Sequence, residues 1–184
     1  RGIGGNFARK EELGLSWFYT WGVSDLESTS IDYVPMCWSG CDEALVQRIV
    51  DKPFITHVLA FNEPDGKDQA NLSPQQAVER YARILKTGLR VGSPACTEGR
   101  WKTWLDEFMK GCREREYRVD FIAIHWYDWG NWIPTKNPSP TDQQIDQMVA
   151  RFKKDIDDLP LIHFSRCRRR LRVSSLRAPH HTKN

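Results

Sequence analysis

The sequence predicts an α/β fold of the (β/α)8 TIM-barrel type, with about six to seven of the eight strands present in this chain. Short apolar runs with the length of buried strands alternate with segments of helical periodicity six times before Pro160, an order typical of parallel β/α units. No glycine-rich phosphate-binding loop follows any of these runs, which removes the common nucleotide-binding folds. A length of 184 residues suits one domain with a substantial core.

The strands are predicted from apolar or alternating runs that end at glycine, proline or polar residues. In the run 16–21, Trp17, Tyr19 and Trp21 alternate onto one side. The run 57–61 is apolar and too short for a helix, so we expect it to be buried on both faces. The predicted strands are residues 2–7, 16–21, 33–38, 57–61, 89–95 and 119–127.

The helices are predicted from capping residues and from apolar residues at helical spacing. Asp42 is placed to cap a helix that runs to residue 50. Two further segments open with a serine or threonine followed three residues later by glutamine, the pattern of a capping box: Ser73 with Gln76, and Thr141 with Gln144. A polar helical turn is expected at 9–13 and an apolar helix at 101–109.

The net charge of +3 conceals a division along the chain. Residues 165–184 hold seven of the 27 basic side chains and no acidic one, so residues 1–164 carry 20 basic against 24 acidic groups. We therefore divide the chain into a partial barrel domain, 1–164, and a basic, disordered or non-native tail, 165–184. Without interleaved aromatic residues the tail does not predict a nucleic-acid partner, and no apolar stretch is long enough to span a membrane.

Five cysteines show no metal-ligand spacing, and their odd number leaves at least one unpaired. Cys96 with Cys112 is one expected disulfide if the protein is secreted, and two buried free thiols are the equal alternative. The five are Cys37, Cys41, Cys96, Cys112 and Cys167.

The chemistry of this chain is predicted to centre on Glu63, which directly follows the fourth strand in Asn62-Glu63-Pro64-Asp65. Parallel α/β folds carry catalytic groups on the loops at the carboxyl ends of their strands. A carboxylic acid there, beside an amide that can bind a sugar hydroxyl, suits the proton donor of glycoside hydrolysis, and the alternative is a merely polar turn. We assign Asp65 and Asp120 to structure.

The composition is ordinary except for its eight tryptophans, a large number for a chain of this length. Flat rings near strand ends suit stacking against sugar faces, whereas Trp101 and Trp104 sit in a helical pattern and are expected in the core. Strand alternation turns Trp126 away from its neighbours His125 and Tyr127 and towards the helices. The tryptophans near strand ends are Trp17, Trp21, Trp38, Trp126, Trp129 and Trp132.

Six motifs in order resemble glycoside hydrolase family 128, whose members act on β-1,3-glucans. The one that includes Glu63 reads Phe61-Asn62-Glu63-Pro64-Asp65, and the match covers roughly residues 1–164. Six motifs in the right order are far more specific than any one of them. They lie at residues 16–22, 33–38, 61–65, 92–95, 104–108 and 119–127.

The resemblance implies a retaining enzyme without metal or cofactor, in which Glu63 is the general acid/base and Asn62 contacts the 2-hydroxyl of the sugar. The acid role would require a raised pKa of Glu63. His125 and Tyr127 match polar groups that line the cleft. Aromatic positions of the first subsites match Trp17, Tyr19, Trp21 and Trp38, and Trp129 is an open candidate in the loop that follows.

The sequence departs from the family where the second carboxylate is expected. The place of the seventh strand reads Pro160-Leu161-Ile162-His163-Phe164-Ser165-Arg166, and no acidic residue follows Asp158. Three explanations stay open: a shifted frame or retained intron near Ile162, a shortened pseudoenzyme, or a carboxylate recruited from Asp128 or Glu98.

Two functions therefore compete. The first is a secreted or cell-wall-associated glycoside hydrolase that acts on β-1,3-glucan by double displacement, with its nucleophile missing from this chain. The second is a β-glucan-binding pseudoenzyme without catalysis.

Overall fold

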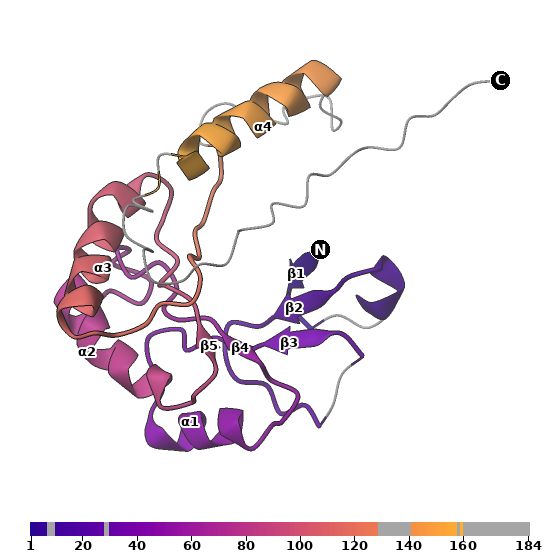
Figure 1. Ribbon diagram of the computed structural model, residues 1–184. Coiled ribbons are helices and arrows are strands. Elements are labelled where there is room, and N and C mark those ends of the chain that lie inside the picture. The colour runs from indigo at the N-terminus through magenta and orange to yellow at the C-terminus, as the bar shows by residue number, and fades with distance from the viewer. Residues whose placement is uncertain (7–9, 28–29, 129–140, 158, 160–184) are drawn as a thin grey trace.

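The structure is a computed structural model and describes residues 1–6, 10–27, 30–128, 141–157 and 159. Parallel strands lie on the inner side of an arc of helices, which confirms the predicted α/β class (Figure 1). The strands are β1 (Gly2–Gly4), β2 (Trp17–Tyr19), β3 (Asp32–Val34), β4 (His57–Val58) and β5 (Arg90–Val91). The helices are α1 (Glu43–Val50), α2 (Pro74–Leu85), α3 (Trp104–Glu114) and α4 (Asp142–Asp157), with 3-10 turns η1 (Lys10–Leu13) and η2 (Arg100–Lys102).

The strands lie side by side in the order of the sequence. One sheet has the order β1-β2-β3 and a second pairs β4 with β5, and the parallel bridge between Met36 and Leu59 joins the two. Bridges from Gly92 to Phe121 and from Cys96 to Ile124 add a sixth parallel segment beside β5. Each connection therefore advances by one position in the same direction, without the reversal found in doubly wound sheets.

The regular strands are shorter than the sequence predicts. Proline has no N–H to donate, so β3 ends before Pro35. The carbonyl of Pro35 still accepts a hydrogen bond from Leu59 N at 2.9 Å. Beside β5, the Ser93 hydroxyl accepts from Ala123 N at 3.0 Å, where a ladder would use the backbone carbonyl. The expected sixth strand, 119–127, thus contributes bridges in place of a continuous ladder.

The predicted caps are confirmed. Asp42 Oδ1 accepts from Leu45 N at 2.8 Å at the start of α1. Ser73 and Gln76 form the full capping box of α2, and Thr141 with Gln144 makes the same pair of bonds before α4. Among the described helices none has the length and apolar composition needed to cross a membrane.

The core lies between the strands and the helices α2 and α3. Tyr81 on α2 meets Phe108 on α3 edge to face at 5.2 Å, and its hydroxyl donates to Val91 O of β5 at 3.2 Å. Trp101 is 1% exposed and confirmed as a core residue, and Trp104, which is partly buried, packs against the core and stacks on Phe108 at 5.9 Å.

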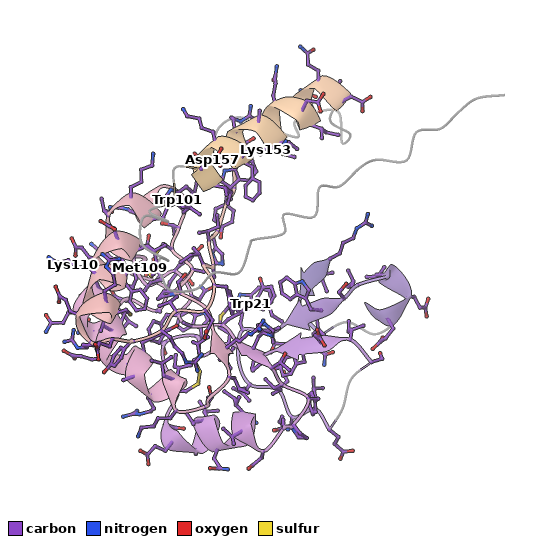
Figure 2. The ribbon with its side chains drawn as sticks, viewed as in Figure 1. Trp21, Trp101, Met109, Lys110, Lys153 and Asp157 are labelled. Atoms are coloured by element: carbon purple, nitrogen blue, oxygen red, sulfur yellow. A yellow bond between two sulfur atoms is a disulfide. The ribbon has the colours of Figure 1, made fainter. Side chains whose placement is uncertain are left out.

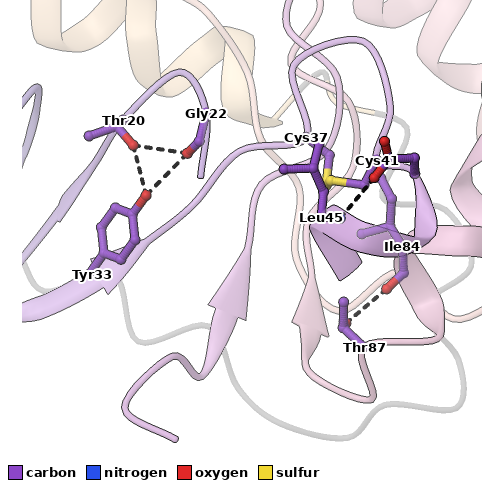
Figure 3. The surroundings of a disulfide bond; sticks show 9 residues. Thr20, Gly22, Tyr33, Cys37, Cys41, Leu45, Ile84 and Thr87 are labelled. Carbon is purple, nitrogen blue, oxygen red and sulfur yellow. Dashed lines mark hydrogen bonds between the residues drawn. A yellow bond between two sulfur atoms is a disulfide. The ribbon is translucent and has the colours of Figure 1, made fainter. Parts of the chain in front are cut away.

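The disulfide lies elsewhere than expected. Cys37 and Cys41 are bonded at the end of β3 (Figure 3), whereas Cys96 and Cys112 are free and buried. Of the two alternatives for Cys96 and Cys112, the disulfide is therefore wrong and the pair of buried free thiols is confirmed. Burial raises the pKa of the Cys112 thiol to about 12 and that of Cys96 further, so both are held as neutral thiols.

Candidate active site

Glu63 lies at the carboxyl end of the fourth strand, at the position that the sequence predicts. Its N–H donates to Ala95 O at 2.8 Å, and its carbonyl accepts from Gly66 N at 2.9 Å. Its φ of 39° is uncommon for a residue with a side chain, so these two bonds hold a strained turn. The turn directs a side chain that is 14% exposed towards the end of the neighbouring strands.

Two side chains from the sixth segment meet one oxygen of this carboxylate. Tyr127 Oη donates to Glu63 Oε1 at 2.6 Å, and His125 Nδ1 lies 2.7 Å from the same oxygen. Tyr127 Oη and His125 Nδ1 are themselves 3.2 Å apart. The structure therefore brings together three of the polar residues that the sequence assigned to the site, Glu63, His125 and Tyr127, across a separation of more than 60 residues.

The pKa of the Glu63 carboxyl lies below its ordinary value of 4.5. Burial raises this pKa, but the hydrogen bonds from Tyr127 and His125, together with the charge of His125, outweigh burial and favour the ionised form. In return, burial and the Glu63 carboxylate raise the pKa of Tyr127 to about 12, so its hydroxyl stays a donor at neutral pH. The raised pKa expected of a general acid is not found for this arrangement of residues.

A row of aromatic rings lies on β2 and just beyond its end. The ring of Tyr19 lies 6.2 Å from that of Trp17 and 5.2 Å from that of Trp21, which is 52% exposed (Figure 2). Trp17 and Tyr19 pack over the glycines of β1, because a Cβ on Gly2 would lie 2.1 Å from the Trp17 ring. Trp17, Tyr19 and Trp21 therefore form the row that the alternation in the sequence predicts.

The model of the glycosyl hydrolase catalytic core family matches residues 5–156. The chain belongs to this family. The resemblance to glycoside hydrolase family 128 is confirmed by solved structures, and the comparison with curated proteins finds no match.

Three of the similar solved structures come from different subgroups of family 128. An endo-β-1,3-glucanase of Amycolatopsis mediterranei in complex with laminaritriose is 30% identical, with a TM-score of 0.69 over 86% of this chain and 66% of its own. An endo-β-1,3-glucanase of Sorangium cellulosum is 28% identical, with a TM-score of 0.57 over 78% and 62%. A curdlan-specific exo-β-1,3-glucanase of Blastomyces gilchristii in complex with glucose is 27% identical, with a TM-score of 0.56 over 83% and 70%. This family member thus spans just under two thirds of the first of these structures.

Asn62 and Trp38, two other predicted sugar contacts in this family member, are less exposed to solvent than Trp17 and Trp21. Asn62 is 5% exposed, and its Nδ2 donates to Gln69 Oε1 at 2.8 Å, while its buried Oδ1 has no partner among the described residues. Trp38 is half-buried, and its carbonyl accepts from Asn62 N at 2.9 Å. The sequence analysis did not identify Gln69 as the partner of Asn62. The sequence indicates only that Gln69 lies in the loop after the fourth strand, close to Asn62. Trp129 lies outside the described residues.

Two other carboxylates near the strand ends, Asp65 and Asp128, are engaged in structure. Asp65 accepts from both the backbone and the hydroxyl of Thr97, as its structural assignment predicts. Asp128 is 4% exposed and binds Arg151 through both oxygens, at 2.6 and 2.5 Å. An Asp128 carboxylate that is buried and ion-paired in this way is a poor candidate for the recruited second carboxylate.

Two predictions for the sixth segment agree with the structure of this family member: Asp120 has a structural role, and Trp126 turns towards the helices. Asp120 accepts from Val91 N at 2.8 Å at the amino end of the strands, away from Glu63. Trp126 turns towards α4, where its Nε1 donates to Asp155 at 2.9 Å and its ring meets Phe152. No group of three potential metal ligands occurs in the part of the chain that the structure describes.

Proposed function

We propose that this chain carries the acid/base half of a glycoside hydrolase site for β-1,3-glucan, with Glu63 as the general acid/base. The observation that carries the proposal is the Glu63 carboxylate at a strand end, bound by Tyr127 and His125, in a chain that also exposes Trp17 on β2 and Trp21 just beyond its end. The A. mediterranei relative binds laminaritriose, which supports a β-1,3-glucan as the ligand here. A polymer of this kind in a cell wall implies a secreted or wall-associated protein.

We also propose that the described strands are part of a (β/α)8 barrel. The sequential parallel order from β1 to the sixth segment supports it, because each step in the same direction continues the curve of a closing sheet. Residues 160–184, where the sequence predicts a seventh strand and a basic tail, lie outside the described part of the chain.

The retaining mechanism needs two carboxyl groups about 5–5.5 Å apart. Glu63 would protonate the departing glycosidic oxygen while the second carboxylate attacks the anomeric carbon, and Glu63 would then deprotonate the water that releases the sugar. Two different glutamates have been replaced by alanine in structures of the A. mediterranei enzyme with laminari-oligosaccharides, which supports a pair of carboxylates in the family.

The lowered pKa of Glu63 favours the alternative function, a glucan-binding protein without catalysis. A second carboxylate at this separation would repel the ionised form of Glu63 by about 3 kcal/mol at an effective dielectric constant near 20, which raises its pKa by about two units. Without that repulsion nothing raises the pKa of Glu63 above its ordinary value, so the carboxyl is ionised at neutral pH and cannot donate the proton.

Laminari-oligosaccharides separate the two functions. Binding measured by calorimetry, with reducing sugar released and the release abolished by Glu63→Gln, would identify the hydrolase. Binding without release would identify the glucan-binding protein, and no binding at all would refute both. Trp21→Ala should weaken binding several-fold because an exposed ring is lost, and Leu13→Ala, which removes a side chain that is 58% exposed outside the aromatic row, is the matched control.

A further inference from the structure

The backbone bonds that join the fifth strand to the sixth segment give way to a side-chain acceptor at Tyr127. Among the described residues, the backbone bond before it runs from His125 N to Cys96 O at 3.2 Å, beside the bridge from Cys96 to Ile124. Parallel rungs repeat every two residues on each strand, so the next would join Tyr127 N to the backbone carbonyl of Glu98. The Glu98 side chain takes this place, because its Oε2 accepts from Tyr127 N at 2.6 Å.

This substitution fixes the backbone from which the Tyr127 side chain projects. Tyr127 is 49% exposed, so packing alone holds it weakly. Its backbone lies between the Glu98 carboxylate and Asp128, which has a φ of 54° and is bound to Arg151 through both oxygens. A charge-assisted bond at the Tyr127 N–H is short and directional, and it therefore orients the residue.

We propose that Glu98 is a positioning residue that holds Tyr127 so that its hydroxyl donates to Glu63 Oε1. Glu98 acts through Tyr127 and is not itself bonded to Glu63 in the structure. The inference rests on the proposed function for the purpose of the Glu63 site, whereas the link from Glu98 through Tyr127 to Glu63 stands on the three residues alone.

The competing role for Glu98 is that of a recruited second carboxylate. The two roles differ in what they require of the side chain. Holding the Tyr127 N–H needs only an oxygen acceptor at this length, which a glutamine amide also supplies, whereas attack on a sugar needs the carboxylate itself. Alanine and glutamine at position 98 remove the same negative charge, so the contrast between them isolates the acceptor.

The test is the pKa of the Glu63 carboxyl, read by NMR in protein labelled with carbon-13 at glutamate carboxyls, with Glu63→Gln to identify the resonance. Glu98→Ala should raise this pKa by about one unit relative to Glu98→Gln, the size expected for loss of a hydrogen bond to a charged group. Equal values in the two variants would overturn the proposal. Glu114→Ala, an exposed glutamate at the end of α3, is the control and should leave the pKa of Glu63 unchanged.

A second comparison tests whether Glu98 acts on Glu63 through Tyr127. Tyr127→Phe should raise the pKa of Glu63 as Glu98→Ala does, and combining the two should add nothing further, because both break the same link. Additive shifts would overturn the proposal. If Glu98→Ala does not fold, Glu98→Leu keeps the side-chain volume and removes the acceptor.

The two failures remain distinguishable because the pKa is measured without substrate. Failure of the proposed function would show as absence of laminari-oligosaccharide binding and cleavage while the pKa pattern persists. Failure of the inference would show as an equal pKa in Glu98→Ala and Glu98→Gln whatever the protein binds.

Discussion

The Cys37–Cys41 disulfide lies next to the candidate site and offers a direct test of what holds this rim in place. Both cysteines are buried, with 1% and 4% of their surface exposed. Cys37 N donates to Leu59 O, and the Trp38 carbonyl inside the loop accepts from Asn62 N, both at 2.9 Å. The disulfide therefore closes a loop that is bonded to the strand leading to Glu63.

The size of its contribution follows from the length of that loop. The cysteines are four residues apart in the sequence. A crosslink around about five residues removes close to 7 cal/mol/K of entropy from the unfolded chain, or about 2 kcal/mol at 25 °C. In a chain of this size that corresponds to a fall in Tm of about 4–8 °C.

The double variant Cys37→Ala/Cys41→Ala should show this lower Tm in a thermal melt followed by circular dichroism. Reductant should lower the Tm of the wild-type protein towards that of the variant and leave the variant unchanged. Cys96→Ala is the matched control, because it removes a buried thiol outside the disulfide and should keep the sensitivity to reductant. Equal Tm values for wild type and double variant, with no effect of reductant on either, would refute the reasoning.

Further predictions concern close packing, capping and protonation. Gly92→Ala places a Cβ 2.4 Å from the Phe121 ring and should lower the free energy of unfolding by about 1–3 kcal/mol, whereas Gly22→Ala, with nothing within 4 Å, should not; equal urea midpoints would contradict this. Ser73→Ala removes the hydroxyl that caps α2 and should cost about 1 kcal/mol in the same urea assay, and an unchanged midpoint would show that the cap is dispensable. Because the pKa of Glu63 in the folded state lies below 4.5, its ionised form stabilises the fold fully above about pH 4.5, and this stabilisation is lost as the pH falls through the folded-state pKa. The free energy of unfolding of wild type minus that of Glu63→Gln should therefore shrink as the pH falls below 4.5, and a constant difference would argue against the bonds to the carboxylate.

Short stretches of sequence were enough to predict where the helices start and that Glu63 lies at a strand end. Asp42 and Ser73 cap their helices because a short polar side chain can satisfy an N–H two or three residues later, whatever the rest of the fold does. Glu63 could be placed at a strand end because an apolar run followed at once by a polar turn is itself a local pattern. The alternation of Trp17, Tyr19 and Trp21 onto one side follows from the period of a strand.

Contacts between segments that are distant in the sequence could not be predicted from such local patterns. The pairing of Cys37 with Cys41 left Cys96 and Cys112 free, and spacing alone could not choose between partners. Gln69, which holds Asn62, lies in a loop whose path depends on the strands around it.

The sequence alone determined the α/β class, the helix caps and the placement of Glu63 at a strand end, because each depends on residues within a few positions of one another. Only the tertiary structure decided the protonation of that acid. Its pKa depends on the balance between burial and the bonds from His125 and Tyr127, which are more than 60 residues away in the chain. The rim bond from Glu98 that orients Tyr127 likewise arises where two parallel segments meet, so no stretch of sequence contains it.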